Sequence, residues 1–203
     1  MLKCFILQLS IISIVYNCMK SFYISILLTL FTFIQKTKSS ACVCTTVPCP
    51  EEGHNPITMG NGYATLDYFY VLHGSHEVVS HAQGLVQPLS LDHGSETTSC
   101  TQKYARMLED DGSQSCDAGH ILANRLGGYG NTPYNIFPQN ASVNRGTYSQ
   151  FEGYIYDYIQ KINNSAKLTW VFFYNENATM PYMVNYSAYF MDGYILNSLF
   201  PNE

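Results

Sequence analysis

Three side chains in the second half of the chain have the types and spacing for metal-assisted acid–base chemistry. His120 can accept a proton near neutral pH, and it follows Gly119, which lets the backbone approach a ligand closely. Asn144 and Glu152 are eight residues apart, and a helix would place them about 80° from each other. Amide and carboxylate oxygens are hard ligands that suit Mg²⁺ and not zinc. These residues predict a base and a hydrated cation at one site.

The segment from about residue 144 onward has the periodicity of an amphipathic helix. Apolar residues recur at three- and four-residue steps, which predicts a buried face. Asn144, Tyr148 and Glu152 follow one another at four-residue steps, so we expect them to share a second face. The apolar positions of the repeat are Phe151, Ile155, Tyr158, Ile159 and Ile162.

The other segments after residue 62 read as strands joined by loops. Residues 124–140 are dense in Gly, Asn and Pro, and a loop of this length in a compact domain usually carries function. The pattern predicts an α+β domain whose loop carries the chemistry. Strands are expected at 63–72, 78–86, 168–174 and 182–191, and residues 101–108 fit either a strand or a short helix.

Four motifs follow one another between residues 117 and 152. They are Asp117-Ala-Gly-His120, Asn135-Ile-Phe-Pro-Gln139, Asn144-Arg-Gly146 and Glu152. This ordered set resembles the DNA/RNA non-specific endonuclease family, which uses the ββα-metal (His-Me finger) motif. The resemblance is densest at 117–152, looser at 168–191 and slight at 42–100. It implies the ββα-metal nuclease fold, with a central antiparallel sheet, a catalytic loop and a helix.

The resemblance also implies a role for each matching residue. His120 corresponds to the general base that takes a proton from the attacking water. Asn144 corresponds to the direct ligand of the catalytic metal, and Glu152 to a carboxylate that holds a metal-bound water. Asn135 corresponds to an asparagine that positions the site, and Asp117 to the acid that begins the motif. The implied cofactor is Mg²⁺, with Mn²⁺ and Ca²⁺ left open.

The implied reaction is hydrolysis of phosphodiester bonds in DNA and RNA. Contact with the phosphate backbone and not with the bases gives little sequence preference. An alternative is a catalytically weak relative that acts as a secreted binding glycoprotein, and a third reading is a nuclease toxin. The sequence carries no signal for the oligomeric state.

Two positions depart from the family pattern. Ala118 stands where the best-studied branch of the family has arginine, which indicates a different branch. The family also places an arginine near the phosphate, and Arg106 matches that position poorly. Arg145 or Arg125 is expected to take this role.

The charge of the chain argues against a basic nucleic-acid-binding surface. The whole chain carries 10 basic and 15 acidic residues, a net charge of −5. The first 40 residues hold four lysines and no acid, so the rest carries 6 basic and 15 acidic residues, or −9. A metal ion and a few local donors must therefore supply the attraction for phosphate. Protonated histidines would help in an acidic compartment, so we expect a lower pH optimum than is usual for the family.

The first 40 residues read as a signal peptide region. Two apolar stretches, 5–16 and 22–34, are each too short for a comfortable membrane span, and Met19-Lys20 separates them. Translation from Met19 would give a complete signal peptide, while an uncleaved anchor or a helical hairpin is the alternative. Residues 41–62 are a Cys- and Pro-rich lead-in, and residues 63–203 are the expected endonuclease domain. No stable membrane association is expected after cleavage.

The cysteines and glycosylation sequons fit export to a secreted, lysosomal or phagosomal location. Five cysteines follow the signal region, which gives two disulfides and one thiol as the simplest count, with zinc binding by the first three as the alternative. A glycan at Asn140 would crowd the site, so we expect it to be absent or to point outward. The cysteines are Cys42, Cys44, Cys49, Cys100 and Cys116, and the sequons begin at Asn140, Asn163, Asn177 and Asn185.

Tyrosines on the predicted helix could stack on nucleic acid bases. Tyr154, Tyr156 and Tyr158 lie at alternating positions. The helical spacing of Tyr154 and Tyr158 instead favours packing against the domain.

Overall fold

The computed structural model describes residues 57–109 and 115–202, which all fall within one compact unit. A six-stranded sheet has the strand order β1-β2-β3-β6-β7-β8, and every neighbouring pair in it is antiparallel. Strands β4 and β5 form a second, two-stranded sheet. The strands are β1 (Ile57–Met59), β2 (Ala64–His73), β3 (His76–Val86), β4 (Asp117–His120), β5 (Ile136–Gln139), β6 (Ala166–Phe173), β7 (Met183–Phe190) and β8 (Ile195–Pro201).

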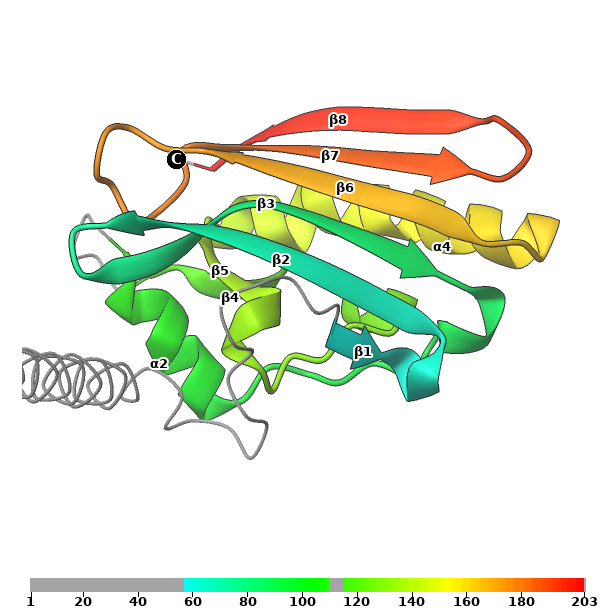
Figure 1. The fold of residues 1–203 in the computed structure, drawn as a ribbon, viewed down its shortest axis with the longest axis horizontal. Helices are drawn as coiled ribbons and strands as arrows, with labels where there is room; N and C mark the ends of the chain where they lie inside the picture. Colours follow the sequence, from blue (N-terminus) through cyan, green and yellow to red (C-terminus); the bar gives the residue numbers. More distant parts are fainter. Residues whose placement is uncertain (1–56, 110–114, 203) are drawn as a thin grey trace, which may run out of the picture. The chain divides into compact units, whose positions relative to one another are not determined.

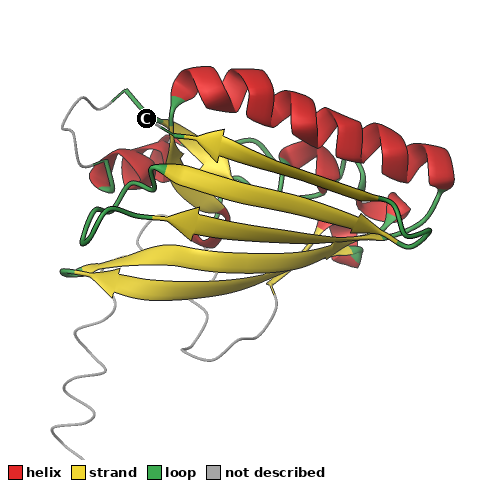
Figure 2. Ribbon diagram, turned by 90° about the horizontal axis from the view of Figure 1, so that it is seen from above, coloured by secondary structure: helices red, strands yellow, loops and turns green. Residues whose placement is uncertain are grey.

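The helices and the small sheet lie together on one side of the six-stranded sheet (Figures 1 and 2). This arrangement confirms the expected α+β class with a central antiparallel sheet. The helices are α2 (Ser99–Met107), α3 (Ala141–Val143) and α4 (Ser149–Ile162), with the π-helical turn η5 (Asn144–Tyr148) between the last two and the 3₁₀ turns η1 (Gly60–Gly62), η2 (Pro88–Ser90), η3 (Asn124–Leu126) and η4 (Pro133–Asn135).

The main core lies between α4 and the inner face of the large sheet. Alternate residues of β6 are buried, including Leu168 and Trp170, as the period of a half-buried strand requires. The apolar stripe of α4 packs onto them through Ile155 and Ile159, which are both fully buried. The hydrophobic pattern at 151–162 and 168–174 was therefore sufficient to predict this interface.

Residues 101–108, which fit either a strand or a helix, belong to helix α2. Thr98 begins it with a capping box, because its side chain accepts from the backbone N–H of Thr101 at 3.2 Å and the Thr101 side chain accepts from the N–H of Thr98 at 2.9 Å. This reciprocal cap satisfies two donors that a helix start would leave unpaired. The capping residues decide the structure here, since the apolar pattern is weak.

Four strands differ from the sequence prediction, and β4 is one of them, because no strand was expected at residues 117–120. β5 lies within residues 124–140, which we expected to be a loop, and β1 lies within the lead-in at 41–62. β8 was not predicted, because its outward side chains Ile195 and Leu199 are apolar and obscure the alternation. Short strands and strands with two apolar faces lack the periodic signal that identifies longer ones.

The start of the long helix departs from regular α geometry. η5 is π-helical, and Gly146 within it has φ −112° and ψ −111°. The rotation of 100° per residue therefore does not apply from Asn144 to Glu152. Tyr148 was expected on a face apart from the core, and this is wrong, because it is fully buried against Phe137, Tyr186 and Phe200.

Several expectations concern residues outside the described part of the chain. The signal region, most of the lead-in, Cys42, Cys44 and Cys49 all lie there. Cys100 is disulfide-bonded and Cys116 is a buried free thiol, which agrees with one unpaired cysteine. Within residues 57–109 and 115–202, no helix is long and apolar enough to cross a membrane.

Candidate active site

The candidate site is built on the β4–β5 hairpin and the helical segment that follows it (Figure 1). β4 pairs antiparallel with β5 so that Asp117 is opposite Gln139 and His120 is opposite Ile136. A Cβ on Gly119 would lie 2.2 Å from Oε1 of Gln139, so this position of the motif requires glycine. The close packing of the two strands fixes the backbone that carries the acid and the histidine.

His120 is held by the backbone of a segment far upstream. Its Nε2 lies 3.0 Å from the carbonyl oxygen of Ser95. A carbonyl can only accept, so Nε2 carries the proton, and Nδ1 is the acceptor nitrogen of the neutral ring. Burial lowers the pKa of His120, although the Ser95 carbonyl and the charge of Glu96 oppose this shift. The ring is thereby kept in the form of a proton acceptor.

Ser95 is itself fixed against the loop that follows β4. Its carbonyl accepts from the N–H of Gly130 at 2.9 Å, and its own N–H donates to the carbonyl of Gly128 at 3.0 Å. A Cβ on Gly128 would lie 1.7 Å from the carbonyl oxygen of Leu122, so the contact depends on glycine. Sequence reasoning had no signal for Ser95, because its backbone carbonyl and not its side chain contacts His120.

Asp117 joins two of the predicted residues. Its carboxylate accepts from Asn144 Nδ2 at 2.9 Å, from Arg145 Nε at 2.8 Å and from a terminal nitrogen of Arg145 at 2.6 Å. Burial alone would raise the pKa of Asp117, but the hydrogen bonds from Arg145 and Asn144 and the charge of Arg145 lower it. Because Nδ2 of Asn144 is bound to the carboxylate, Oδ1 is the amide atom left for a cation.

The segment that carries Asn144 begins at Asn140. The Asn140 side chain caps α3 by accepting from the backbone N–H groups of Ser142 at 2.9 Å and Val143 at 3.3 Å. The N–H of Asn144 donates to the carbonyl of Asn140 at 2.9 Å. Asn140 therefore positions the proposed metal ligand, and the glycosylation state of its sequon stays a prediction.

Glu152 is a buried carboxyl group, with 9% of its surface exposed. Burial raises its pKa to about 8, and the charge of Arg125 opposes the rise. Arg125 approaches the first turns of α4, where its guanidinium donates to Ser149 Oγ at 3.5 Å and lies 3.1 Å from the Cβ that Gly153 would carry. The structure thus places Arg125 near Glu152, whereas Arg145 is paired with Asp117.

Asn135 is fully buried and binds the loop that follows β4. Its Oδ1 accepts from the N–H of Leu122 at 2.7 Å, and its Nδ2 donates to the carbonyls of Leu122 at 2.9 Å and Tyr129 at 3.2 Å. These contacts support the expected positioning role through the backbone of the loop. A buried amide with three backbone partners is a structural support and not a group that contacts substrate.

Gln139 also belongs to the site, although the sequence motif suggested no role for it. It is 1% exposed, and its Oε1 has no hydrogen-bond partner among the described residues. This acceptor lies against Gly119, between His120 and Asp117 in the sequence. An unpaired buried acceptor costs stability, so a water molecule or a ligand donor is expected at this position.

The donor set fits a hydrated hard cation. Among the described residues, no group of three His, Cys, Asp or Glu side chains could hold a metal ion. The amide oxygen of Asn144, with water and phosphate oxygens beside it, is the kind of ligand that hard divalent cations accept.

Comparisons with known proteins agree with this architecture. A probable deoxyribonuclease, RhsA of Dickeya dadantii (strain 3937), is 37% identical over 130 residues, which are 64% of this chain and 9% of that protein. The chain therefore spans less than a tenth of the length of that relative.

Two solved structures are similar to this chain at low sequence identity. A structure described as an extracellular endonuclease has a TM-score of 0.50 at 11% identity and covers 82% of this chain and 85% of its own. NucA from Streptococcus agalactiae with a magnesium ion bound has a TM-score of 0.47 at 13% identity, with 79% and 78% covered. The first of these likenesses confirms the fold class that was expected from the sequence.

The model of the DNA/RNA non-specific endonuclease family matches residues 61–190. This range includes every residue of the candidate site, from Ser95 to Glu152. Since the match covers more than half of the chain, the chain belongs to the DNA/RNA non-specific endonuclease family.

Proposed function

We propose that this protein is a metal-dependent endonuclease that hydrolyses phosphodiester bonds of DNA and RNA with little sequence preference. The observation that carries the proposal is the hydrogen bond from Asn144 to Asp117, at 2.9 Å. Asp117 lies on β4, the strand that also carries His120. This contact turns the amide so that its oxygen can bind a cation. The family and the RhsA relative support the same reaction class.

His120 acts as the general base in this mechanism. Nδ1 takes a proton from the attacking water, and the imidazolium that forms keeps its Nε2–H on the Ser95 carbonyl, which stabilises the positive charge. The fixed ring loses little entropy when the water is bound. After the phosphodiester bond breaks, the proton leaves His120 to solvent and the neutral base returns.

Asn144 and Glu152 serve the metal ion in this proposal. Oδ1 of Asn144 would bind the cation directly, and the Glu152 carboxylate would hold a water of its shell. A bound cation neutralises charge on the scissile phosphate and on the leaving oxygen. It also favours the ionised form of Glu152, which burial otherwise disfavours.

Arg125 is the better candidate for the arginine that contacts phosphate. It is exposed and lies by the first turns of α4. Arg145 is 73% exposed, but its guanidinium already forms a paired contact with Asp117. We therefore assign phosphate binding to Arg125 and support of Asp117 to Arg145.

Export of the protein is part of the proposal. The apolar N-terminal region, the sequons and the disulfide at Cys100 support secretion into an oxidising compartment. Nucleic acid substrates would then be met outside the cytoplasm.

The test is digestion of plasmid DNA and of RNA by the purified protein with Mg²⁺, with and without chelator. We expect cleavage of both substrates, loss of cleavage in chelator and a decrease of about 10²–10⁴-fold for His120→Ala. His81→Ala is the matched control, because His81 is exposed on β3. Cleavage that survives chelation, or that is equal in the two variants, would refute this mechanism.

A second candidate is a catalytically weak, nuclease-like binding glycoprotein. The net charge of −9 after residue 40 (6 basic and 15 acidic residues) favours it, because repulsion from phosphate slows association. The same assay separates the two candidates, since the binding glycoprotein is expected to cleave neither DNA nor RNA in any divalent metal.

A further inference from the structure

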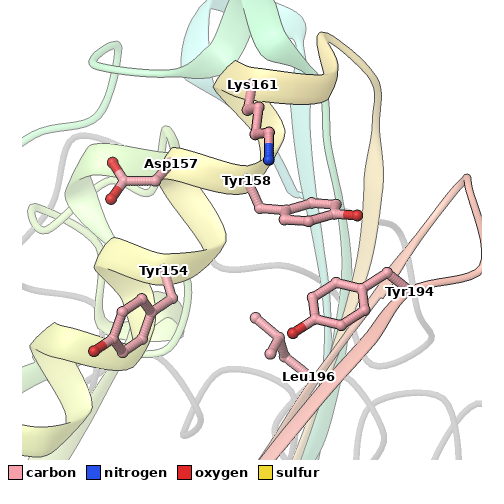
Figure 3. Close-up of a pocket in the computed structure, with 6 residues that line it drawn as sticks. All are labelled: Tyr154, Asp157, Tyr158, Lys161, Tyr194 and Leu196. Carbon is pink, nitrogen blue, oxygen red and sulfur yellow. The ribbon is translucent and has the colours of Figure 1, made fainter.

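A cleft separate from the candidate active site lies between α4 and the β7–β8 hairpin. Its volume is about 250 Å³. Figure 3 shows its lining side chains, which come from α4, from the turn before β8 and from β8 itself. They are Tyr154, Asp157, Tyr158, Lys161, Tyr194 and Leu196.

One wall of the cleft is a rigid aromatic stack. The rings of Tyr158 and Tyr194 are stacked, with centroids 4.8 Å apart and an interplanar angle of 30°. Asp192 holds both residues, because it accepts from the Tyr158 hydroxyl at 2.7 Å and from the backbone N–H of Tyr194 at 3.1 Å. Phe190 packs behind Tyr158 at 4.4 Å. Because these rings are already held in place, a ligand that stacks here would bind with little entropic cost from ordering side chains.

Two further lining residues of α4, Tyr154 and Lys161, provide an open ring and a cation. Tyr154 is 65% exposed, so the expectation that it packs against the domain is wrong. Tyr154, Asp157, Tyr158 and Lys161 lie at the i, i+3, i+4 and i+7 positions of one helix and form a continuous stripe. In Figure 3 the ammonium group of Lys161 points into the cleft beside Tyr158. The site therefore combines two aromatic surfaces with one basic residue, Lys161, and one acidic residue, Asp157.

We infer that this cleft binds one base of a single-stranded nucleic acid, stacked on tyrosine, with its phosphate at Lys161. Stacking on aromatic rings with a nearby cation is the usual basis of binding to single strands without sequence preference. The rise of 1.5 Å per residue along α4 places Lys161 about 14 Å beyond Glu152, which a strand of a few nucleotides can span. The inference rests on the proposed nuclease function.

Such a site would explain how an acidic chain holds its substrate. The affinity would come from stacking, which does not depend on the net charge of the protein. Lys161 would then make the affinity for the strand only weakly dependent on salt concentration. The substrate class would be single-stranded DNA or RNA, or a duplex end that has opened.

The test measures binding of a short fluorescent single-stranded DNA to the full chain in chelator, with His120→Ala as the background so that the strand stays intact. Tyr154→Ala is expected to weaken binding about five-fold or more, and Tyr154→Trp to retain it. The protein that keeps Tyr154 should bind an abasic strand more weakly than the normal strand. Tyr154→Ala should bind the abasic and the normal strand with equal affinity. Lys161→Gln should reduce the slope of log affinity against log salt by about one. Tyr189→Ala, on an exposed tyrosine of β7, is the matched control.

The outcomes separate this inference from the proposed function. If the unmodified protein with Mg²⁺ cleaves the strand while Tyr154→Ala and Tyr189→Ala bind alike, the cleft assignment is wrong and the nuclease proposal stands. If the strand is neither bound nor cleaved, both are wrong. Competition by a neutral oligosaccharide, together with equal binding of normal and abasic strands, would assign the cleft to carbohydrate and overturn the inference.

Discussion

The side-chain amide of Asn144 donates to the carboxylate of Asp117 across 2.9 Å, and this single contact decides which atom of the amide can bind a metal ion. An unsupported amide can turn over and present its nitrogen instead, which cannot bind a cation. Support of a metal ligand by a neighbouring carboxylate is a common source of affinity in metal sites. In the proposed mechanism, Asp117 therefore acts through Asn144.

Asp117→Asn should weaken metal binding, because an amide at position 117 no longer holds Nδ2 of Asn144 in one orientation. We expect the Mg²⁺ concentration for half-maximal cleavage to rise about 10- to 100-fold. Arg145→Gln is the comparison, since it removes the ion pair and keeps the contact of Asp117 with Asn144. Equal Mg²⁺ dependence in Asp117→Asn and the unmodified protein would contradict the role given to Asp117.

The activity should reach its plateau at mildly acidic pH. Burial lowers the pKa of His120, so the neutral base is present at lower pH than for an exposed histidine. The acidic limb of kcat/KM against pH should have an apparent pKa below about 6.5. Glu96→Gln should move this limb to still lower pH, because the Glu96 charge raises the pKa of His120. An optimum above pH 8 would count against His120 as the base. A shift of the acidic limb to higher pH in Glu96→Gln would count against it as well.

Glu152→Gln should stabilise the metal-free protein more as the pH rises. The folded chain releases the Glu152 proton at a pKa of about 8, and the ordinary value is 4.5. The stability that comes from the neutral carboxyl is thus complete below pH 4.5, declines as pH rises and is lost above about 8. We expect the Tm advantage of Glu152→Gln in chelator to grow by roughly 3 °C or more between pH 5 and pH 8. Added Mg²⁺ should reduce this advantage, and a constant difference across pH would contradict the burial of an ionisable group.

Asn135→Ala should destabilise the loop after β4. The substitution leaves the N–H and carbonyl of Leu122 and the carbonyl of Tyr129 without their buried partner. The expected cost is about 2–4 kcal/mol, or a decrease of roughly 5–15 °C in Tm. Asn131→Ala, at an exposed position of the same loop, is the control and should change Tm little. Equal Tm values in the two variants would mean that Asn135 does not support the loop.

The sequence was sufficient for the parts of the protein with strong local signals. The apolar period of α4 and the alternation in β6 predicted core residues, and the order of motifs from Asp117 to Glu152 predicted the family. The face of Tyr148 was predicted wrongly, because the π-helical turn changes the rotation between Asn144 and Glu152. No pattern in the sequence announces such a turn.

Contacts made by the backbone were also outside the reach of sequence reasoning. The carbonyl of Ser95, which binds His120, is 25 residues away in the chain and could belong to any amino acid. The choice between Arg125 and Arg145 depended on which of them meets Asp117, and that is a property of the folded chain. Strand β8 was missed for a different reason, since its exposed apolar residues imitate buried ones.

Among the described residues, the helices lie on one side of the six-stranded sheet, so its far face offers an attachment surface (Figure 2). Tyr189, Ile195 and Leu199 are exposed on strands β7 and β8, on the positions that alternate with the buried core residues. A cysteine introduced at Leu199 would carry a dye or a bead linker there, with the whole thickness of the sheet between the linker and His120. The protein could in this way be immobilised with its chemistry directed toward the solution.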